Sequence, residues 1–305
     1  MISIILQGKG INSRIWGSIK AYLFLLPLFA GLIIFCYYPP ISGVYHSFFD
    51  WNDIGSKRYI GFANYVELFK DKVFLGSIPT AFKLLLPRLA IGTIVPLIMA
   101  EMIYAVAWKK LQYAYRVAIL LPAVAPGVVG LLIWKYIYDP TSGLLISLLR
   151  EFGIVGQNTI IDWLGNPKTV IPSIVFMGFP WIGGTSVLIY MSGIMNISTE
   201  VIEASQLDGA NVFRRIWFID IPLLMGQIRF FVIFGLIGGL QDFGIQIVLT
   251  HGGPGYSTYV PAYYMFIEAF TAGRMGYAST IGVVIFSSIL MLSLIALKYF
   301  KTEMN

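Results

Sequence analysis

The segment from residue 203 to residue 222, EASQLDGANVFRRIWFIDIP, is a polar stretch between two strongly apolar ones. Its charged residues are Glu203, Asp208, Arg214, Arg215 and Asp220. The preceding segment, 169–195, has no charged residue, and the following segment, 230–250, has only Asp242. Charged side chains are costly in the hydrocarbon interior of a bilayer. The pattern therefore predicts a water-exposed loop that joins two membrane-spanning helices.

The composition of the whole chain also indicates a membrane protein. The 305 residues are 57% hydrophobic and only 12% charged, whereas about 25% of the residues of an average soluble domain are charged. Apolar stretches continue almost from end to end, so we expect one membrane domain rather than two soluble ones. The formal net charge of +6 does not indicate nucleic-acid binding, because many basic residues flank apolar stretches, as they do in membrane proteins.

Six segments are long and apolar enough to cross a bilayer as helices, which takes about 20 residues each. These predicted spans are 20–45, 82–106, 114–137, 170–195, 229–250 and 277–299. The apolar stretch of the first exceeds the roughly 7–15 residues of a signal-peptide core, so we expect it to be retained. The predicted fold class is an all-α, polytopic membrane protein. Its parts are an N-terminal segment 1–19, a transmembrane domain 20–300 with a loop at 196–228, and a tail 301–305.

The basic residues give the orientation of the chain. Positive residues close to the membrane on short segments face the cytoplasm. One side of the predicted topology has such residues at Lys9, Arg14, Lys20, Lys109, Lys110, Arg116, Arg214, Arg215, Arg229, Lys298 and Lys301. We therefore expect both termini and the 196–228 loop to be cytoplasmic.

The sequence has few residues that could form a catalytic or metal site. A single cysteine, Cys36, excludes a disulfide within the chain and a multi-cysteine metal site. The two histidines, His46 and His251, have no cluster of ligands near them, so we expect no metal. Gly252-Gly253-Pro254 lacks the Lys-Ser or Lys-Thr of a phosphate-binding loop and predicts a tight turn instead. These absences disfavour an enzyme and leave the chain without a nucleotide motif.

The spacing within residues 203–222 resembles the EAA loop of ATP-binding-cassette importer permeases. That pattern is Glu-Ala-Ala, a glycine four residues after its third position, and a closing Ile-x-Leu-Pro. The chain has Glu203-Ala204-Ser205, then Gly209, then Ile219-Asp220-Ile221-Pro222. Ser205 stands where alanine is usual, and Ile221 where leucine is usual. Asp208-Gly209-Ala210 is similar to the carbohydrate-uptake, maltose-type branch of this family.

Physical reasoning supports short helices at this loop. Gly209 permits a turn that a residue with a Cβ would resist, and Pro222 is tolerated in the first turn of a new helix. We therefore expect short helices that meet at an angle along the membrane surface. By itself this pattern is equally compatible with an interfacial loop that has no partner.

Other segments also resemble the carbohydrate branch. In this chain Tyr38-Pro39, Ser47-Phe48 and the segment 61–65 resemble the first external loop of that branch. The segment from Arg116 to Trp134, with Leu121-Pro122 and Pro126, is similar to its third span, and Leu249-Thr250 with Gly252-Gly253-Pro254 to its last external loop. The branch often has Phe-Asp shortly before that threonine. Here the pair is Phe243-Gly244, and the acid stands at Asp242.

The resemblance implies a function and a set of partners. It implies a non-catalytic permease subunit of an ATP-driven sugar or oligosaccharide importer in a bacterial cytoplasmic membrane. ATP and Mg²⁺ would be bound by separate cytoplasmic subunits, which dock on the coupling loop at Glu203, Ala204, Ser205, Asp208, Gly209, Ala210, Ile219 and Pro222. A second related permease would complete a heterodimer, and an external solute-binding protein would deliver the carbohydrate.

The competing class is a self-sufficient secondary transporter or channel. Such a protein would favour an inverted repeat and several acidic residues within its spans, and neither is evident. An ionisable residue within a span nevertheless indicates function, and Asp242 is such a residue. With Gln241, Phe243 and Gln246 it could line a substrate path, or it could face a partner subunit or pair within the bundle. For Lys83, Arg88 and Glu101, near the ends of the second span, we expect side chains that extend to the interface.

Overall fold

The computed structural model describes residues 11–52, 55 and 57–299, with side chains from residue 22 onward. The predicted tail 301–305 and the first ten residues of the predicted N-terminal segment lie outside the described residues. The last part of that segment is already helical, because the first helix begins at Ile11.

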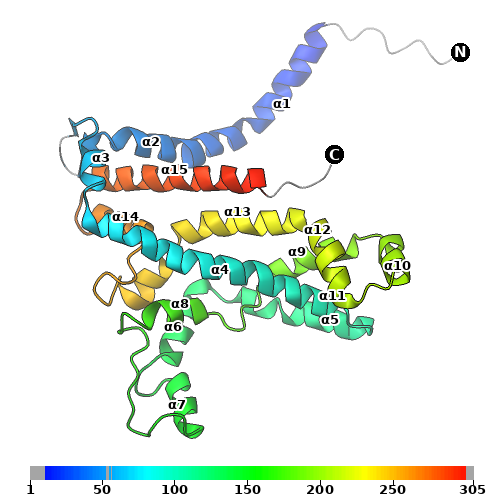
Figure 1. Cartoon of the computed structure of the whole chain (residues 1–305). Helices are drawn as coiled ribbons and strands as arrows, with labels where there is room; N and C mark the ends of the chain where they lie inside the picture. Colours follow the sequence, from blue (N-terminus) through cyan, green and yellow to red (C-terminus); the bar gives the residue numbers. More distant parts are fainter. Residues whose placement is uncertain (1–10, 53–54, 56, 300–305) are drawn as a thin grey trace, which may run out of the picture.

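Helices account for most of the described chain, which confirms the all-α prediction (Figure 1). The N-terminal half contains α1 (Ile11–Leu32), the π-helical turn η1 (Ile33–Tyr37), α2 (Tyr38–His46), α3 (Ala63–Leu68), α4 (Lys72–Tyr104), α5 (Lys109–Ala118), the 3₁₀ turn η2 (Leu121–Val124), α6 (Gly127–Ile137) and α7 (Leu144–Glu151). The C-terminal half contains α8 (Val170–Phe176), α9 (Gly184–Met195), α10 (Thr199–Leu207), α11 (Val212–Arg215), η3 (Ile216–Asp220), α12 (Ile221–Leu223), α13 (Met225–Gln241), η4 (Gln246–Thr250), α14 (Pro261–Phe270) and α15 (Met275–Tyr299). Two short strands, β1 (Phe49–Asp50) and β2 (Arg58–Tyr59), form an antiparallel pair.

Four stretches of helix among the described residues are long and apolar enough to cross a membrane. They are Tyr22–His46, Lys72–Tyr104, Met225–Thr250 and Met275–Tyr299. They confirm the first, second, fifth and sixth predicted spans as apolar helices, although the second begins ten residues earlier than predicted. A fifth span is obtained if α5–η2 and α6, which are bent by 87°, count as one. A total of six crossings and cytoplasmic termini stay predictions.

The third and fourth predicted spans are not continuous helices, so those two predictions are wrong in this respect. The third bends at Ala125, which is extended as expected for a residue before proline, here Pro126. The fourth is interrupted between α8 and α9, where Gly178 and Trp181 have positive φ values of 88° and 58°. Backbone groups at such breaks must find partners within the protein, and the indole nitrogen of Trp181 donates a hydrogen bond to the Val175 carbonyl.

The two ends of the helical bundle carry different structures (Figure 1). At one end α10, α11 and α12 lie with α5 and the C-terminal end of α4. At the other end α3 and α14 lie beside the N-terminal end of α15. Helix α4 links the two ends and packs against α9, α13 and α14. The long helix α4 therefore connects the polar loop at one end with the connections at the other.

Helix α9 approaches the third predicted span very closely at Gly184. A Cβ added there would lie 2.1 Å from the backbone carbonyl oxygen of Ile119, and a backbone atom cannot rotate away. We expect Gly184→Ala to destabilise the protein by about 1–3 kcal/mol, the usual cost of overpacking. The matched control is Gly130→Ala in α6, where a Cβ meets no atom within 4 Å. This control should raise stability by up to about 1 kcal/mol. Thermal unfolding in detergent measures both, and equal midpoints would contradict the close approach.

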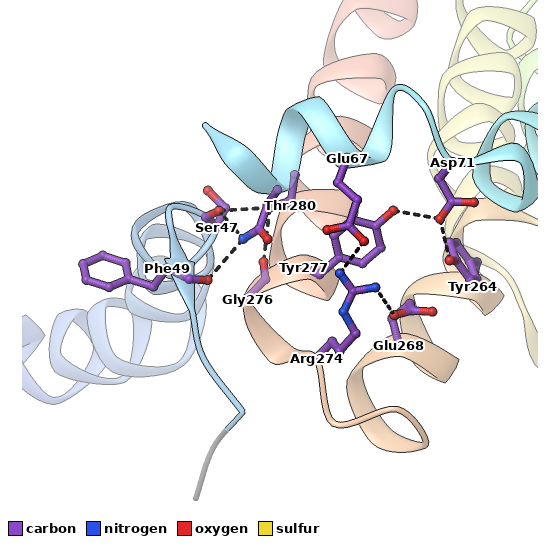
Figure 2. A network of polar contacts seen from close by, with 11 residues as sticks. Ser47, Phe49, Glu67, Asp71, Tyr264, Glu268, Arg274, Gly276, Tyr277 and Thr280 are labelled. Carbon is purple, nitrogen blue, oxygen red and sulfur yellow. Dashed lines mark hydrogen bonds and ion pairs between the residues drawn. The ribbon is translucent and has the colours of Figure 1, made fainter. Parts of the chain in front are cut away.

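A polar network joins the elements at the end of the bundle opposite α10 (Figure 2). Arg274 pairs with both Glu67 and Glu268. Asn64 donates to the backbone carbonyls of Ser47 and Phe49, and Thr280 also donates to that of Ser47. The Asp71 carboxylate accepts hydrogen bonds from the hydroxyls of Tyr264 and Tyr277, at 2.6 and 2.8 Å. These contacts fix the segments 47–49 and 64–71 against α14 and α15.

The hydrogen bonds of the Asp71 carboxylate predict that acid destabilises this end of the protein. Burial alone would raise its pKa, but the hydrogen bonds from Tyr264, Tyr277 and the Phe74 and Val73 amides together lower the pKa below its ordinary 3.8. A depressed folded-state pKa contributes stability above the unfolded pKa, and this is lost as the pH falls through the folded value. We expect the unfolding temperature in detergent to fall below about pH 4, and Asp71→Asn to reduce that dependence. An identical pH profile for wild type and variant would contradict this.

Candidate functional site

The polar loop folds as two short helices joined by a turn. Ser198 caps α10, since the Val201 amide donates to its Oγ at 3.4 Å, and Asn211 caps α11, since the Arg214 amide donates to its Oδ1 at 2.9 Å. Between the two helices Gly209 has a φ of +76°, a conformation that favours glycine. The prediction of short helices around a turn at Gly209 is therefore confirmed, and their position along the membrane surface stays a prediction.

The outer surface of this loop consists of both predicted and unpredicted residues. Of the predicted residues, Glu203, Ala204, Asp208, Gly209 and Pro222 are exposed, and Ala210 and Ile219 are half-buried. Ser205 is buried, and its hydroxyl donates to the Ile202 carbonyl at 2.7 Å. Sequence analysis missed the exposed apolar side chains of this loop, which include Leu207, Phe213, Trp217 and Phe218. These large apolar residues within a charged loop are visible in the sequence, and exposed apolar side chains at such a place indicate an interaction with another surface.

A buried group of charges lies at the base of the loop and was also missed. Arg215 Nε donates to Asp220 Oδ2 at 2.9 Å, and Arg215 Nη2 lies 3.5 Å from Glu101 Oε2 near the end of α4. The side chains are 16%, 1% and 7% exposed, respectively. The expectation that Glu101 extends to the interface is therefore wrong, because a cationic partner allows this carboxylate to be buried within the protein.

Asp242 ends α13 and forms an ion pair with Arg88 of α4. The distance between Arg88 Nη1 and Asp242 Oδ2 is 3.2 Å, and the Gly244 amide donates to Asp242 Oδ1 at 3.0 Å. Both charged side chains border a cavity of about 220 Å³, which is otherwise lined by Leu85, Leu89, Gly235, Gly238 and Gly239. Of the alternatives for Asp242, pairing within the bundle is thus observed. Arg88 is exposed, but it also pairs with Asp242. The sequence predicted that its side chain extends to the membrane interface and did not predict this ion pair.

The structure separates the other predicted path residues from this ion pair. Gln241 and Phe243 line a different, mostly apolar cavity of about 500 Å³, and Phe243 packs on Phe266 with 5.6 Å between ring centroids. Gln246 is buried, and its amide donates to the Thr258 carbonyl at 3.1 Å. Among the four predicted residues, only Asp242 borders the cavity beside Arg88.

Aromatic rings gather at the break between α8 and α9. Phe176 and Phe179 are stacked at 5.2 Å, and Trp181 stands edge-on to both at 5.6 and 5.0 Å. Trp134 of α6 contacts Phe176 at 6.0 Å. Phe176 and Phe179 remain exposed. The two phenylalanines meet Trp134 and Trp181 here because the fourth predicted span is broken between α8 and α9.

Comparison with known proteins identifies the family. Residues 92–304 match the family model described as "Binding-protein-dependent transport system inner membrane component". The chain belongs to this family. It is also 32% identical to the probable ABC transporter permease protein YurN of Bacillus subtilis, over 93% of this chain and 97% of that protein. Identity is 27% to the multiple sugar-binding transport system permease protein MsmF of Streptococcus mutans, over 96% of this chain and 98% of that one.

Solved structures of similar fold agree with this assignment. A bacterial ABC transporter involved in alginate import superposes with a TM-score of 0.83 at 24% identity, covering 96% of this chain and all of that chain. A bacterial alginate ABC transporter in complex with a pentasaccharide-bound periplasmic protein gives a TM-score of 0.82 at 25% identity, over 95% and 99% of the chains. As a member of the matched family, the permease is a multi-pass, non-catalytic translocation subunit. Within the part of the chain that the structure describes, no group of three potential metal ligands comes together.

Proposed function

We propose that this permease serves an ATP-driven importer and that the loop at 196–228 docks on a cytoplasmic ATP-binding subunit. The observation that carries the proposal is the exposed pair of helices α10 and α11 on either side of Gly209, on which Glu203, Asp208 and apolar side chains such as Leu207 face outward. ATP and Mg²⁺ would be held by that partner subunit. Its closure would move the loop and so open the bundle alternately to each side of the membrane.

We infer that the transported solute is a sugar or oligosaccharide. Relatives support this, since their names include a multiple sugar-binding system and a diacetylchitobiose uptake system of Streptomyces coelicolor. The aromatic rings at the α8–α9 break and the Arg88–Asp242 pair supply the ring faces and hydrogen-bonding groups that a sugar requires. Both regions border one apolar cluster, because Met177, at the break, and Phe243, next to Asp242, pack against it.

The proposed assembly contains further subunits in a bacterial cytoplasmic membrane. An external solute-binding protein would deliver the sugar, and a second related permease would complete the translocation path. The family description supports the binding protein and the membrane location, since it names a binding-protein-dependent system and an inner membrane component.

Co-expression with a companion ATP-binding subunit, the partner permease and the binding protein tests this function. We expect the subunits to purify together in mild detergent, and sugar-loaded binding protein to stimulate ATP hydrolysis by the complex in liposomes. ATP-independent sugar uptake by the permease alone, with no ATP-binding subunit retained, would contradict the proposal.

The proposed orientation is tested by the reaction of introduced cysteines, after replacement of the exposed Cys36. Asn211→Cys lies on the exposed loop between α10 and α11, and Tyr256→Cys replaces a side chain that is 64% exposed in the connection before α14. We expect an impermeant thiol reagent to modify Asn211→Cys only in inside-out vesicles and Tyr256→Cys only in right-side-out vesicles. The reverse pattern would overturn the orientation.

A further inference from the structure

The buried charges of Arg215, Asp220 and Glu101 connect two parts of the protein that otherwise belong to separate elements. Arg215 and Asp220 lie at the two ends of the segment that leads from α11 through η3, whereas Glu101 lies in the last turn of α4. One guanidinium contacts both carboxylates through different nitrogens, Nε and Nη2. This two-sided contact uses the planar fork of arginine, which the single ammonium of lysine lacks.

The burial of this group makes the contact sensitive to the loss of any one partner. Asp220 is 1% exposed and Glu101 is 7% exposed, and removal of one partner of a buried pair leaves an uncompensated charge. Neither carboxylate oxygen of Glu101 has a hydrogen-bond partner among the described residues, so the burial of this side chain depends on its ion pair with Arg215 at 3.5 Å. The exposed pair of Arg58 and Asp50 differs, since its side chains are 76% and 65% exposed and such pairs contribute little.

Helix α4 extends from this group to the ion pair beside the proposed sugar path. Arg88 precedes Glu101 on the same helix by about 20 Å at 1.5 Å per residue. Pro87 and Pro96 lie inside α4, yet the helix is continuous over its 33 residues. A displacement of the C-terminal end of α4 at Glu101 would therefore also move Arg88 relative to Asp242.

We propose that Arg215 is a positioning residue that ties the loop to α4 through Asp220 and Glu101, so that movement of the loop displaces α4 and the Arg88–Asp242 pair. This inference rests on the proposed docking of the loop on the ATP-binding subunit. It assigns transmission to a salt-bridged contact below the docking surface, using residues that take no part in docking itself.

Arg215→Met in the full complex is the first test. We expect the ATP-binding subunit to co-purify and to hydrolyse ATP, while sugar uptake per ATP falls within the 5- to 150-fold range typical of coupling between two sites. Arg215→Lys keeps the charge but cannot bridge both carboxylates, so its loss should be intermediate. The control is Arg58→Met, which removes an arginine from an exposed ion pair and should leave the ratio unchanged. An unchanged ratio in Arg215→Met would overturn the proposal.

A neutral variant resolves the case in which Arg215→Met fails to fold. Glu101→Gln, Arg215→Met and Asp220→Asn together remove all three charges, so no buried charge is left unpaired. We expect this variant to assemble but to remain uncoupled. Normal coupling, or failure of both variants to assemble, would make these charges elements of folding alone and would overturn the inference. Failure of the proposed docking is distinguishable, because the wild-type permease would then purify without an ATP-binding subunit.

Discussion

Gly209→Leu is expected to leave the permease in the membrane but to reduce sugar uptake per ATP hydrolysed by about tenfold or more, within the range of known coupling energies. Gly209 has a φ of +76°, and a Cβ there would meet no atom within 4 Å. The added Cβ itself therefore meets no neighbour, and the expected cost is the roughly 1–2 kcal/mol of a left-handed conformation. We expect the turn to relax, so that α11 changes direction relative to α10 and the docking surface is lost. ATP hydrolysis and uptake in the same liposomes measure the effect.

The matched control for this prediction is Gly209→Asn. Asparagine also adds a Cβ, but it adopts the left-handed region far more readily than leucine. Uptake per ATP should therefore stay close to that of the wild type. Full uptake by Gly209→Leu, with normal assembly of the ATP-binding subunit, would contradict the assignment of this loop as the coupling element.

Asp242→Asn is expected to lower uptake by about 10- to 100-fold at low sugar concentration while the complex still assembles. An ionisable side chain within a membrane-spanning segment is costly, so the retention of Asp242 at the end of α13 requires a partner, water or a ligand. Asp242 has Arg88 as a partner and borders a cavity. Hydrogen bonds to charged groups contribute about 1.5–3 kcal/mol, which corresponds to the expected loss. Uptake across a range of sugars would also show altered dependence on the substrate.

Two comparisons separate the roles that Asp242 could have. Asp50→Asn removes a carboxylate from the exposed pair with Arg58 and should leave uptake unchanged. Exchange of the charges in Arg88→Asp/Asp242→Arg keeps an ion pair, so this variant should also assemble, but the substrate preference of the wild type should not return. Weakened assembly of Asp242→Asn with unchanged preference would place Asp242 at a subunit contact, and unchanged uptake and assembly would exclude both roles.

Local features explain what could be predicted from the sequence. The apolar helices that begin at Tyr22, Lys72, Met225 and Met275 follow from the number of residues needed to cross a bilayer. The two helices around Gly209 follow from the polarity of the loop and from a turn that favours glycine. The family could also be predicted from the sequence, because the residues of the EAA loop stand at fixed spacings within the single segment 203–222.

The breaks in the third and fourth spans could not be predicted from composition. Membrane helices tolerate proline and glycine where neighbouring groups satisfy the freed backbone, so Pro126 and Pro180 are compatible with a continuous helix or with a broken one. The surrounding packing decides between them. Gly184 allows α9 to approach the backbone at Ile119, and the break before it brings Phe176, Phe179 and Trp181 together.

The sequence by itself therefore determined the membrane class, the family and the position of the loop, because spans, turns and motif spacings are properties of short segments. Only the tertiary structure decided which charges meet. Arg88 and Asp242 are 154 positions apart, and Glu101 lies on a different element from Arg215. The low dielectric of the interior requires each buried charge to have a partner, but the choice of partner depends on how α4 packs against α13 and the base of the loop.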